Sequence, residues 1–349
     1  MPELEDATFV QALECTWAYH PFGKELIEEF VEGGVTAINE TIAYLNEDFN
    51  GIVKEISKFR RMCDEAQNAM VATTVSEIEK AKQEGKLAAI IGLQHLPLVT
   101  SYYPDDLSFL YALHYMGVKI IQLTYQRRNL IGDGCGERTN SGLSKFGIQV
   151  VEEMNRLGIL IDLSHTGPKS SMEAIEMSKD PVVFSHSNCR ALCDNVRNKD
   201  DELIKALAER GGVQGIVMFP PILNQQRPPT MDDFLDHIEH VINLVGADHV
   251  GIGLDYSAPQ WPSHPDVELQ RRMWRASREG VRRNWPELEP PYDAFVPGKG
   301  SYRIEELDSP TKWKASISKG LDKRGYSTLE IKKVLGENFM RVFRKVWRA

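Results

Sequence analysis

The chain has 349 residues, 42% of them hydrophobic, and a formal net charge of −9 at pH 7. This hydrophobic content is enough for a large buried core, and the length suits a single α/β barrel. The negative charge argues against a nucleic-acid-binding surface, because such surfaces hold phosphates through an excess of basic residues.

No apolar stretch approaches the roughly 20 residues that a membrane-spanning helix needs, so we expect no membrane association. The acidic segment Met1–Asp6 lacks the apolar core of a secretion signal. Five cysteines are too few and too scattered for a disulfide framework, and this pattern is typical of reduced thiols. Together these features predict a cytoplasmic protein.

Short apolar runs alternate with helix-like segments along almost the whole chain, which predicts βα units and a parallel sheet. Eight runs are predicted to be strands: Thr8–Cys15, Val35–Asn39, Leu87–Leu93, Val118–Leu123, Gly158–Leu163, Val182–Ser185, Val213–Met218 and Val250–Leu254. A long polar helix is expected over about Asn46–Ala69. Because eight strands close a (β/α)8, or TIM, barrel, we expect the α/β class with one barrel domain over residues 1–349.

The segment from Tyr256 to Arg303 interrupts this alternation. We interpret residues 256–303 as a loop insertion over the active-site face, since long loops in compact domains are usually functional. Its tryptophans either form pocket walls or pack the insertion itself; they are Trp261, Trp274 and Trp285. Two C-terminal helices, Ser327–Leu335 and Glu337–Trp347, are predicted to close the chain.

Polar residues follow several predicted strands, at the end where parallel barrels collect their ligand-binding groups. They are Gln94, Tyr125, His165, His186 and Asp255. His165 and His186 end two successive apolar runs, and two such histidines can bind one metal ion. With Asp255 they form a ligand set suited to zinc with an open position for water. Such a metal activates water and polarises a carbonyl, as amide hydrolysis requires.

Two residues have alternative roles. Asp255 either ligates the metal, accepts the proton of the attacking water as general base, or only caps the turn after its strand. Arg197, on the loop after the sixth strand, either holds a substrate carboxylate in a bidentate contact or pairs with a nearby acid at the surface. The first alternative for Arg197 predicts a small substrate that bears a carboxylate.

Taken together, the motifs resemble those of the renal, or membrane, dipeptidase family. The matching segments are 161–165 (IDLSH), 183–187 (VFSHS), Arg197-Asn198 followed by Asp200-Asp201, 251–256 (GIGLDY) and 336–338 (GEN). The resemblance extends from about Leu87 to the C-terminus. It implies a (β/α)8 barrel of the amidohydrolase type, a two-zinc site and hydrolysis of dipeptides, including those with a D-residue in second place.

The resemblance also implies a role for individual residues. His165 and His186 correspond to the ligands of one zinc, Arg197 to the residue that binds the substrate carboxylate, and Asp255 to the metal-linked aspartate that handles the water proton. Family members are often dimers, so a homodimer is compatible with the resemblance.

One half of the site departs from the family pattern. The first strand of the family ends in a His-x-Asp pair for the other zinc, whereas this chain offers only Glu14, Cys15 and His20, none at that spacing. Gln94 stands in place of the bridging carboxylate, and a neutral amide brings no charge to offset two cations. Tyr125 replaces a histidine that contacts the scissile carbonyl, and its phenol can still donate a hydrogen bond.

These departures predict one zinc per chain rather than two, with Gln94, Tyr125 and Arg197 facing the substrate. Three functions stay open. The favoured one is a dipeptidase-like, metal-dependent hydrolase that cleaves an amide or peptide bond of a small carboxylate-bearing substrate. The others are a lyase or isomerase that uses Tyr125, and a non-catalytic descendant that binds a small molecule or a partner. Retention of the histidines and Asp255 argues against the last, because a binding module does not need that set.

Overall fold

Eight parallel strands form a closed barrel in the computed structural model, which describes residues 2–19, 23–43, 47–96, 106–257, 266–297 and 300–348. Each strand pairs with the next around the ring, and the last returns to the first. The barrel strands are β1 (Val10–Glu14), β2 (Ala37–Thr41), β4 (Leu87–Leu93), β5 (Val118–Gln122), β6 (Leu160–Asp162), β7 (Val183–Phe184), β8 (Val213–Ile216) and β9 (Val250–Ile252). The predicted (β/α)8 barrel is confirmed, and every predicted run overlaps one of these strands.

A short additional strand, β3 (Ala69–Val71), pairs with the amino-terminal half of β4. The sequence prediction was wrong here, because it extended a helix to Ala69. The helix, α3 (Phe49–Glu65), ends four residues earlier, where Ala66 takes an extended backbone with φ −83° and ψ 122°. The apolar residues after this bend form strand hydrogen bonds to Leu87–Ala89, which outweigh the helical tendency of a three-residue tail.

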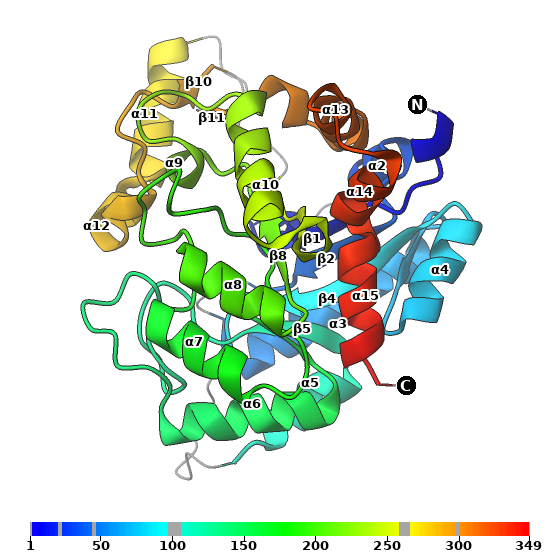
Figure 1. Cartoon of the computed structure of the whole chain (residues 1–349), viewed down its shortest axis with the longest axis vertical. Coiled ribbons are helices and arrows are strands. Elements are labelled where there is room, and N and C mark those ends of the chain that lie inside the picture. The colour runs from blue at the N-terminus through cyan, green and yellow to red at the C-terminus, as the bar shows by residue number, and fades with distance from the viewer. Residues whose placement is uncertain are drawn as a thin grey trace.

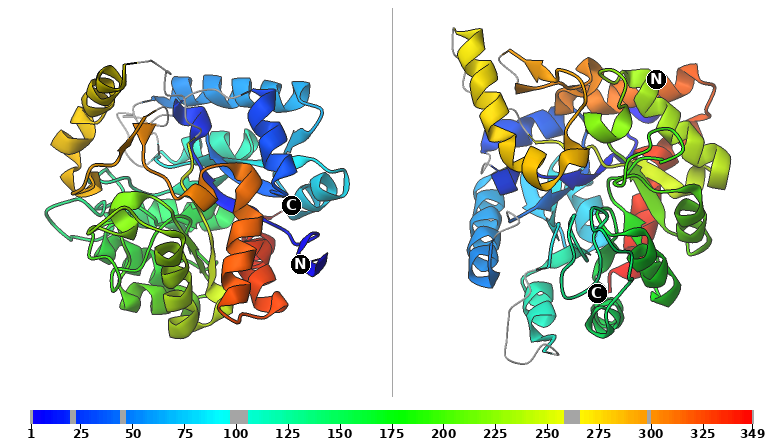
Figure 2. Two further views of the ribbon diagram at one scale, coloured as in Figure 1. Left: turned by 90° about the horizontal axis from the view of Figure 1, so that it is seen from above. Right: turned by 90° about the vertical axis from the view of Figure 1, so that its left-hand side faces the viewer.

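Helices surround the barrel in all three views (Figures 1 and 2). In chain order before the last strand they are α1 (Thr16–Tyr19), α2 (Lys24–Glu32), α3, α4 (Val75–Gln83), α5 (Ser108–Tyr115), α6 (Lys145–Leu157), α7 (Pro168–Met177), α8 (Asp201–Glu209), α9 (Pro220–Leu223) and α10 (Met231–Val245). The helices α8 and α10 begin at side-chain caps: Asp200 accepts from Leu203 N at 2.9 Å, and Thr230 and Asp233 form a capping box.

The amino-terminal end of the barrel is closed by the C-terminal helix. The two predicted C-terminal helices form one run: α14 (Thr328–Lys332), a π-helical turn η5 (Lys333–Glu337) and α15 (Asn338–Val346). Phe339 and Phe343 pack on the small side chains inside the barrel, such as Val10 and Ala88. Gly251 permits this contact, because a Cβ there would lie 2.4 Å from the Phe339 ring. The functional end of the barrel is therefore the opposite one.

The insertion after β9 contains regular helices, α11 (Val267–Ser277) and α12 (Glu279–Asn284), a 3₁₀ turn η3 (Pro286–Leu288) and a hairpin of β10 (Phe295–Val296) and β11 (Gly300–Ser301). Figure 1 shows them gathered beside α9. Trp274 packs on Phe295 inside the insertion, whereas Trp285 lies against Tyr125; Trp261 lies outside the described residues. The next helix after the insertion, α13 (Pro310–Lys323), packs against α2 and α10 of the barrel wall. No helix in the described ranges is long and apolar enough to cross a membrane.

Candidate metal centre

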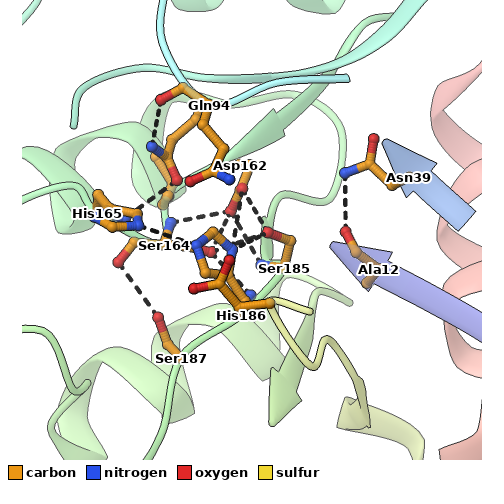
Figure 3. Close-up of polar contacts among 12 residues, drawn as sticks. Ala12, Asn39, Gln94, Asp162, Ser164, His165, Ser185, His186 and Ser187 are labelled. Carbon is orange, nitrogen blue, oxygen red and sulfur yellow. Dashed lines mark hydrogen bonds and ion pairs between the residues drawn. The ribbon is translucent and has the colours of Figure 1, made fainter. Parts of the chain in front are cut away.

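The carboxyl ends of neighbouring strands bring three of the predicted site residues into contact. His165 follows β6 and His186 follows β7, and their Nε2 atoms lie 3.0 Å apart. Tyr125, which follows β5, stacks on the His165 ring with ring centroids 3.9 Å apart and an interplanar angle of 19°. Both histidines are buried, and Figure 3 shows their rings side by side. The pairing of these two strand ends follows from adjacent barrel strands in register.

The surroundings of His165 fix which ring nitrogen carries the hydrogen. Nδ1 lies 2.7 Å from Gln126 Oε1, and Cys135 Sγ donates to the same oxygen at 2.9 Å. An amide oxygen only accepts, so Nδ1 must be the protonated nitrogen of the neutral ring. His165 Nε2 is thus left with a lone pair that faces His186.

A second network fixes His186 in the same tautomer. Its Nδ1 lies 2.7 Å from Ser185 Oγ, and Ser185 donates its own hydrogen to Asp162 Oδ2 at 2.5 Å. Ser164 donates to the other oxygen, Asp162 Oδ1, at 2.6 Å. With the hydroxyl hydrogen of Ser185 already used, His186 Nδ1 is the donor and its Nε2 carries the lone pair. Carboxylate-linked histidines of this kind are typical of metal ligands.

Two imidazole lone pairs therefore face each other across 3.0 Å, an arrangement that favours a cation between them. Burial lowers the pKa of both histidines well below its usual value, and the positive charge of Arg197 lowers it further. Both rings are neutral at pH 7, which is the form that binds metals. The donor set suits zinc, for which histidine nitrogen is a preferred ligand.

A third protein ligand is not assembled in the described part of the chain. No group of three His, Cys, Asp or Glu side chains lies close enough there to hold a metal ion. Asp255 instead accepts a hydrogen bond from Cys15 Sγ at 3.4 Å. Burial raises the pKa of Asp255, and the nearby Arg197 partly offsets that rise. The roles of Asp255 as ligand or base stay predictions.

The backbone of Asp255 is strained, with φ +53° in the left-handed region. A non-glycine residue held in this region costs roughly 1–3 kcal/mol, and such residues cluster at functional sites. The next residue, Tyr256, accepts a backbone hydrogen bond from Cys15 N at 3.0 Å, which ties this turn to the segment after β1. This strain supports a functional role for Asp255.

Arg197 lies beneath the histidines rather than at the surface, and it is only 1% exposed. Its NH1 donates to Ser164 O at 2.5 Å and to Ser187 Oγ at 2.8 Å, and its NH2 donates to His186 O at 2.7 Å. The guanidinium thus ties the two histidine-bearing segments together. The surface ion pair considered for Arg197 is not what the structure shows, and its contact with a substrate carboxylate stays a prediction.

Gln94 forms hydrogen bonds with residues of two neighbouring strands, β2 and β5. Its Nε2 donates to Thr41 Oγ1 at 3.0 Å, and Gln122 Nε2 donates to the backbone oxygen of Gln94 at 2.5 Å. Figure 3 places Gln94 on the side of the site near His165. The substrate-binding role of Gln94 stays a prediction, as does that of Tyr125, whose pKa is raised by burial and by the charge of Asp255.

The first two barrel strands carry one buried carboxyl group each, Glu14 on β1 and Glu40 on β2, and β1 lacks the family's His-x-Asp pair. A register shift between Gln11 and Glu14 places Glu14 opposite Glu40 of β2, and both are fully buried. One oxygen of each, Oε2, has no hydrogen-bond partner among the described residues. Burial raises the pKa of Glu14 to about 8 and the pKa of Glu40 well above its usual value. His20 lies outside the described residues.

Several residues around the histidines were missed by the sequence analysis. They are Gln126, Asp162, Ser185 and Lys199, whose buried ammonium donates to Leu163 O and Thr166 O at 2.9 Å. Burial lowers the pKa of Lys199 to about 7. Asp162 and Ser185 lie within the same motifs as the histidines, so the motifs contained a signal. No sequence motif pointed to Gln126, because its hydrogen-bond partners are distant in sequence.

A histidine pair at the carboxyl-terminal mouth of a (β/α)8 barrel is the arrangement of metal-dependent barrel hydrolases. The chain matches the family described as membrane dipeptidase, peptidase family M19, over residues 18–284. The chain belongs to this family. The resemblance inferred from the motifs is thus confirmed.

Two curated relatives illustrate this similarity. A region of 188 residues is 36% identical to dipeptidase verJ of Clonostachys rogersoniana and covers 53% of this chain and 47% of that protein. A region of 245 residues is 32% identical to dipeptidase 3 of Rattus norvegicus and covers 68% of this chain and 48% of that protein. The chain therefore spans about half the length of the curated relatives that it matches.

Two solved structures share the fold over nearly the whole chain. An amidohydrolase from Pseudomonas aeruginosa has a TM-score of 0.82 at 32% identity, covering 99% of this chain and 98% of that chain. A metallo peptidase from Rhodobacter sphaeroides, liganded with a phosphinate mimic of the dipeptide L-Ala-D-Ala, has a TM-score of 0.76 at 18% identity, covering 98% and 99%. The second likeness shows the fold alone.

Proposed function

We propose that this chain is a dipeptidase-like, metal-dependent hydrolase that cleaves an amide bond of a small substrate with a carboxylate. The observation that carries the proposal is the pair of Nε2 atoms 3.0 Å apart, each with its lone pair directed by a hydrogen bond at Nδ1. Membership in the membrane dipeptidase family and two relatives named dipeptidases support the reaction class.

We propose that His165 and His186 hold one zinc ion per chain. A bound zinc ion supplies Lewis acidity, which polarises the scissile carbonyl and makes water a better nucleophile at neutral pH. Asp255 accepts the proton of the water, and its raised pKa makes it a stronger base than an exposed carboxylate. Tyr125 keeps its proton, because its pKa is raised, and donates a hydrogen bond to the carbonyl oxygen as negative charge develops there.

The substrate carboxylate is assigned to Arg197, with Gln94 as an uncharged neighbour. Arg197 is the arginine that the sequence motifs single out, and its charge acts on Asp255, Tyr125 and both histidines. A positive charge in this position favours substrates with a free carboxylate. Dipeptides, including those with a D-residue in second place, are the substrates that we propose.

The test is hydrolysis of a panel of L,L and L,D dipeptides by zinc-loaded protein. We expect activity in the wild type, none in His186→Ala, and a fall in kcat of about 100-fold in Tyr125→Phe, as for loss of one oxyanion donor. His240→Ala is the matched control, because His240 pairs with Asp201 at 2.7 Å on the outer helices and should keep full activity. A zinc-loaded wild type that cleaves none of these dipeptides contradicts the proposal.

A lyase or isomerase reaction is the second candidate. The observation that favours it is the protonated phenol of Tyr125 stacked 3.9 Å from the His165 ring, which offers an acid beside the metal position. Such a reaction would move a proton to substrate without net water consumption. Turnover of non-peptide carboxylates by a protein that is inactive on every dipeptide distinguishes it from the hydrolase.

We further propose that the protein works in the cytoplasm and forms a homodimer. All five cysteines are buried free thiols, which suits a reducing compartment. The net charge of −9 disfavours nucleic acid as a partner. Light scattering of the purified protein tests the oligomeric state, with twice the monomer mass expected and the monomer mass as the contrary result.

A further inference from the structure

One side chain of the insertion reaches the candidate metal centre through a single glutamine. Glu287 lies in η3, and Gln126 follows β5 directly after Tyr125. Gln126 Nε2 donates to Glu287 Oε1 at 3.0 Å, and Gln126 Oε1 lies 2.7 Å from His165 Nδ1. Gln126 is fully buried. Its amide thus connects a carboxylate of the insertion to the ring of a proposed metal ligand.

The surroundings of Gln126 admit one orientation of its amide. The oxygen accepts from Cys135 Sγ at 2.9 Å and lies 2.7 Å from His165 Nδ1. The carboxylate oxygen of Glu287 is the acceptor in its contact with Gln126 Nε2. A rotated amide would turn its oxygen toward that carboxylate and its NH2 group toward two donors. The charge of Glu287 therefore selects the observed orientation.

A hydrogen bond to the backbone oxygen of Glu287 holds this residue in place independently of its carboxylate. Asn195 Nδ2 donates to Glu287 O at 2.8 Å, which fixes η3 against the loop after β7. Gly136 N donates to Gln126 O at 2.9 Å, and a Cβ on Gly136 would lie 2.9 Å from Glu287 Oε1. The glycine therefore leaves the space that the carboxylate occupies.

A second contact of the insertion acts on the same histidine ring. Trp285 packs edge-on against Tyr125, with ring centroids 5.8 Å apart and an interplanar angle of 67°. Tyr125 in turn stacks on His165. The plane of the His165 ring is thus supported from the insertion by Trp285, two residues from Glu287.

We propose that Glu287 sets the tautomer of His165 through Gln126, and that Glu287 and Gln126 are positioning residues of the metal centre. With the Gln126 oxygen facing it, His165 carries its hydrogen on Nδ1 and presents the Nε2 lone pair to the metal. His186 receives the same tautomer from Ser185 without any contact to the insertion. The inference rests on the proposed metal-binding role of His165.

Charge reversal at position 287 tests this relay. In Glu287→Lys the introduced ammonium donates, so the Gln126 amide is expected to rotate and place its NH2 group against His165 Nδ1. His165 then carries its hydrogen on Nε2. The readout is the 15N chemical shift of the His165 ring nitrogens in metal-free protein labelled at histidine, which distinguishes the two tautomers. Glu279→Lys, an exposed charge reversal in α12 of the same insertion, is the matched control and should leave the tautomer unchanged.

A double variant provides the rescue. Gln126→Glu combined with Glu287→Lys pairs the new carboxylate with the introduced lysine and still accepts from Nδ1–H, so the original tautomer should return. Zinc affinity, measured by competition with a chromophoric chelator, should fall about 10- to 100-fold in Glu287→Lys relative to Glu279→Lys. The double variant should recover this loss.

Persistence of the Nδ1–H tautomer in folded Glu287→Lys, with the zinc affinity of Glu279→Lys, would overturn the proposal. If circular dichroism shows that Glu287→Lys does not fold, Glu287→Ala takes its place, and a mixture of both tautomers is expected. A single Nδ1–H tautomer in that variant also overturns the relay. Failure of the proposed function looks different: the tautomer would switch as expected, while the wild type takes up no zinc.

Discussion

Replacement of Arg197 by lysine separates its structural role from substrate binding. Three hydrogen bonds join the guanidinium to Ser164 O, Ser187 Oγ and His186 O at 2.5, 2.8 and 2.7 Å. The single ammonium of a lysine reaches one of these acceptors, so two charged hydrogen bonds are lost, although Ser187 Oγ still donates to Ser164 O at 3.3 Å. At about 1.5–3 kcal/mol for each charged hydrogen bond, Arg197→Lys should lose about 3–6 kcal/mol of the free energy of unfolding.

The assay is equilibrium urea denaturation of the metal-free protein, where no substrate or metal contributes. A loss of this size is a large part of the roughly 5–15 kcal/mol that stabilises a typical protein, so the unfolding midpoint should fall clearly. Arg190→Lys is the matched control on the same loop, because its exposed pair with Asp194 should contribute less than about 1 kcal/mol. If Arg197→Lys unfolds at the wild-type midpoint, the three hydrogen bonds of the guanidinium do not stabilise the fold and the structural reasoning is wrong.

Three further predictions concern the carboxyl and amide groups of the mouth. Burial raises the pKa of Glu14 from 4.5 to about 8, so its protonated form stabilises the fold below about pH 4.5 and this contribution is lost as the pH rises through 8. Glu14→Gln should therefore flatten the decline of the melting temperature between pH 5 and 9; an unchanged decline contradicts the raised pKa. Gln94→Ala removes one hydrogen bond to Thr41 and should leave zinc uptake within about threefold of the wild type, by calorimetry, since a single neutral bond contributes about 1 kcal/mol. A loss of all zinc would instead make Gln94 a ligand. Asp255→Asn should lower kcat by at least about 100-fold with dipeptides, because the amide cannot accept the proton, and wild-type kcat would exclude Asp255 as the base.

Sequence periodicity was sufficient for the barrel and for the histidine pair. The eight barrel strands are apolar runs bounded by turn residues, and the histidines end two of them, so local pattern and chain order carried the prediction. β3 was missed because Ala69 was assigned to the end of the preceding helix, whereas the strand forms through its pairing with β4.

The surroundings of the site could not be predicted, because they depend on contacts between distant segments. Gln126 and Glu287 are 161 positions apart, and no local pattern relates them. Glu14 lies opposite Glu40 because of a register shift in β1, and no sequence pattern indicates that shift. The surface ion pair considered for Arg197 was wrong, because its guanidinium is buried and donates to the backbone oxygens of Ser164 and His186.

The central claim is that His165 and His186 together hold one metal ion. Metal analysis by mass spectrometry after dialysis against zinc tests it most directly, with the wild type compared to His165→Ala and His186→Ala. The account predicts one zinc per chain in the wild type and none in either variant. A wild type that retains no zinc, or variants that retain as much as the wild type, would contradict it.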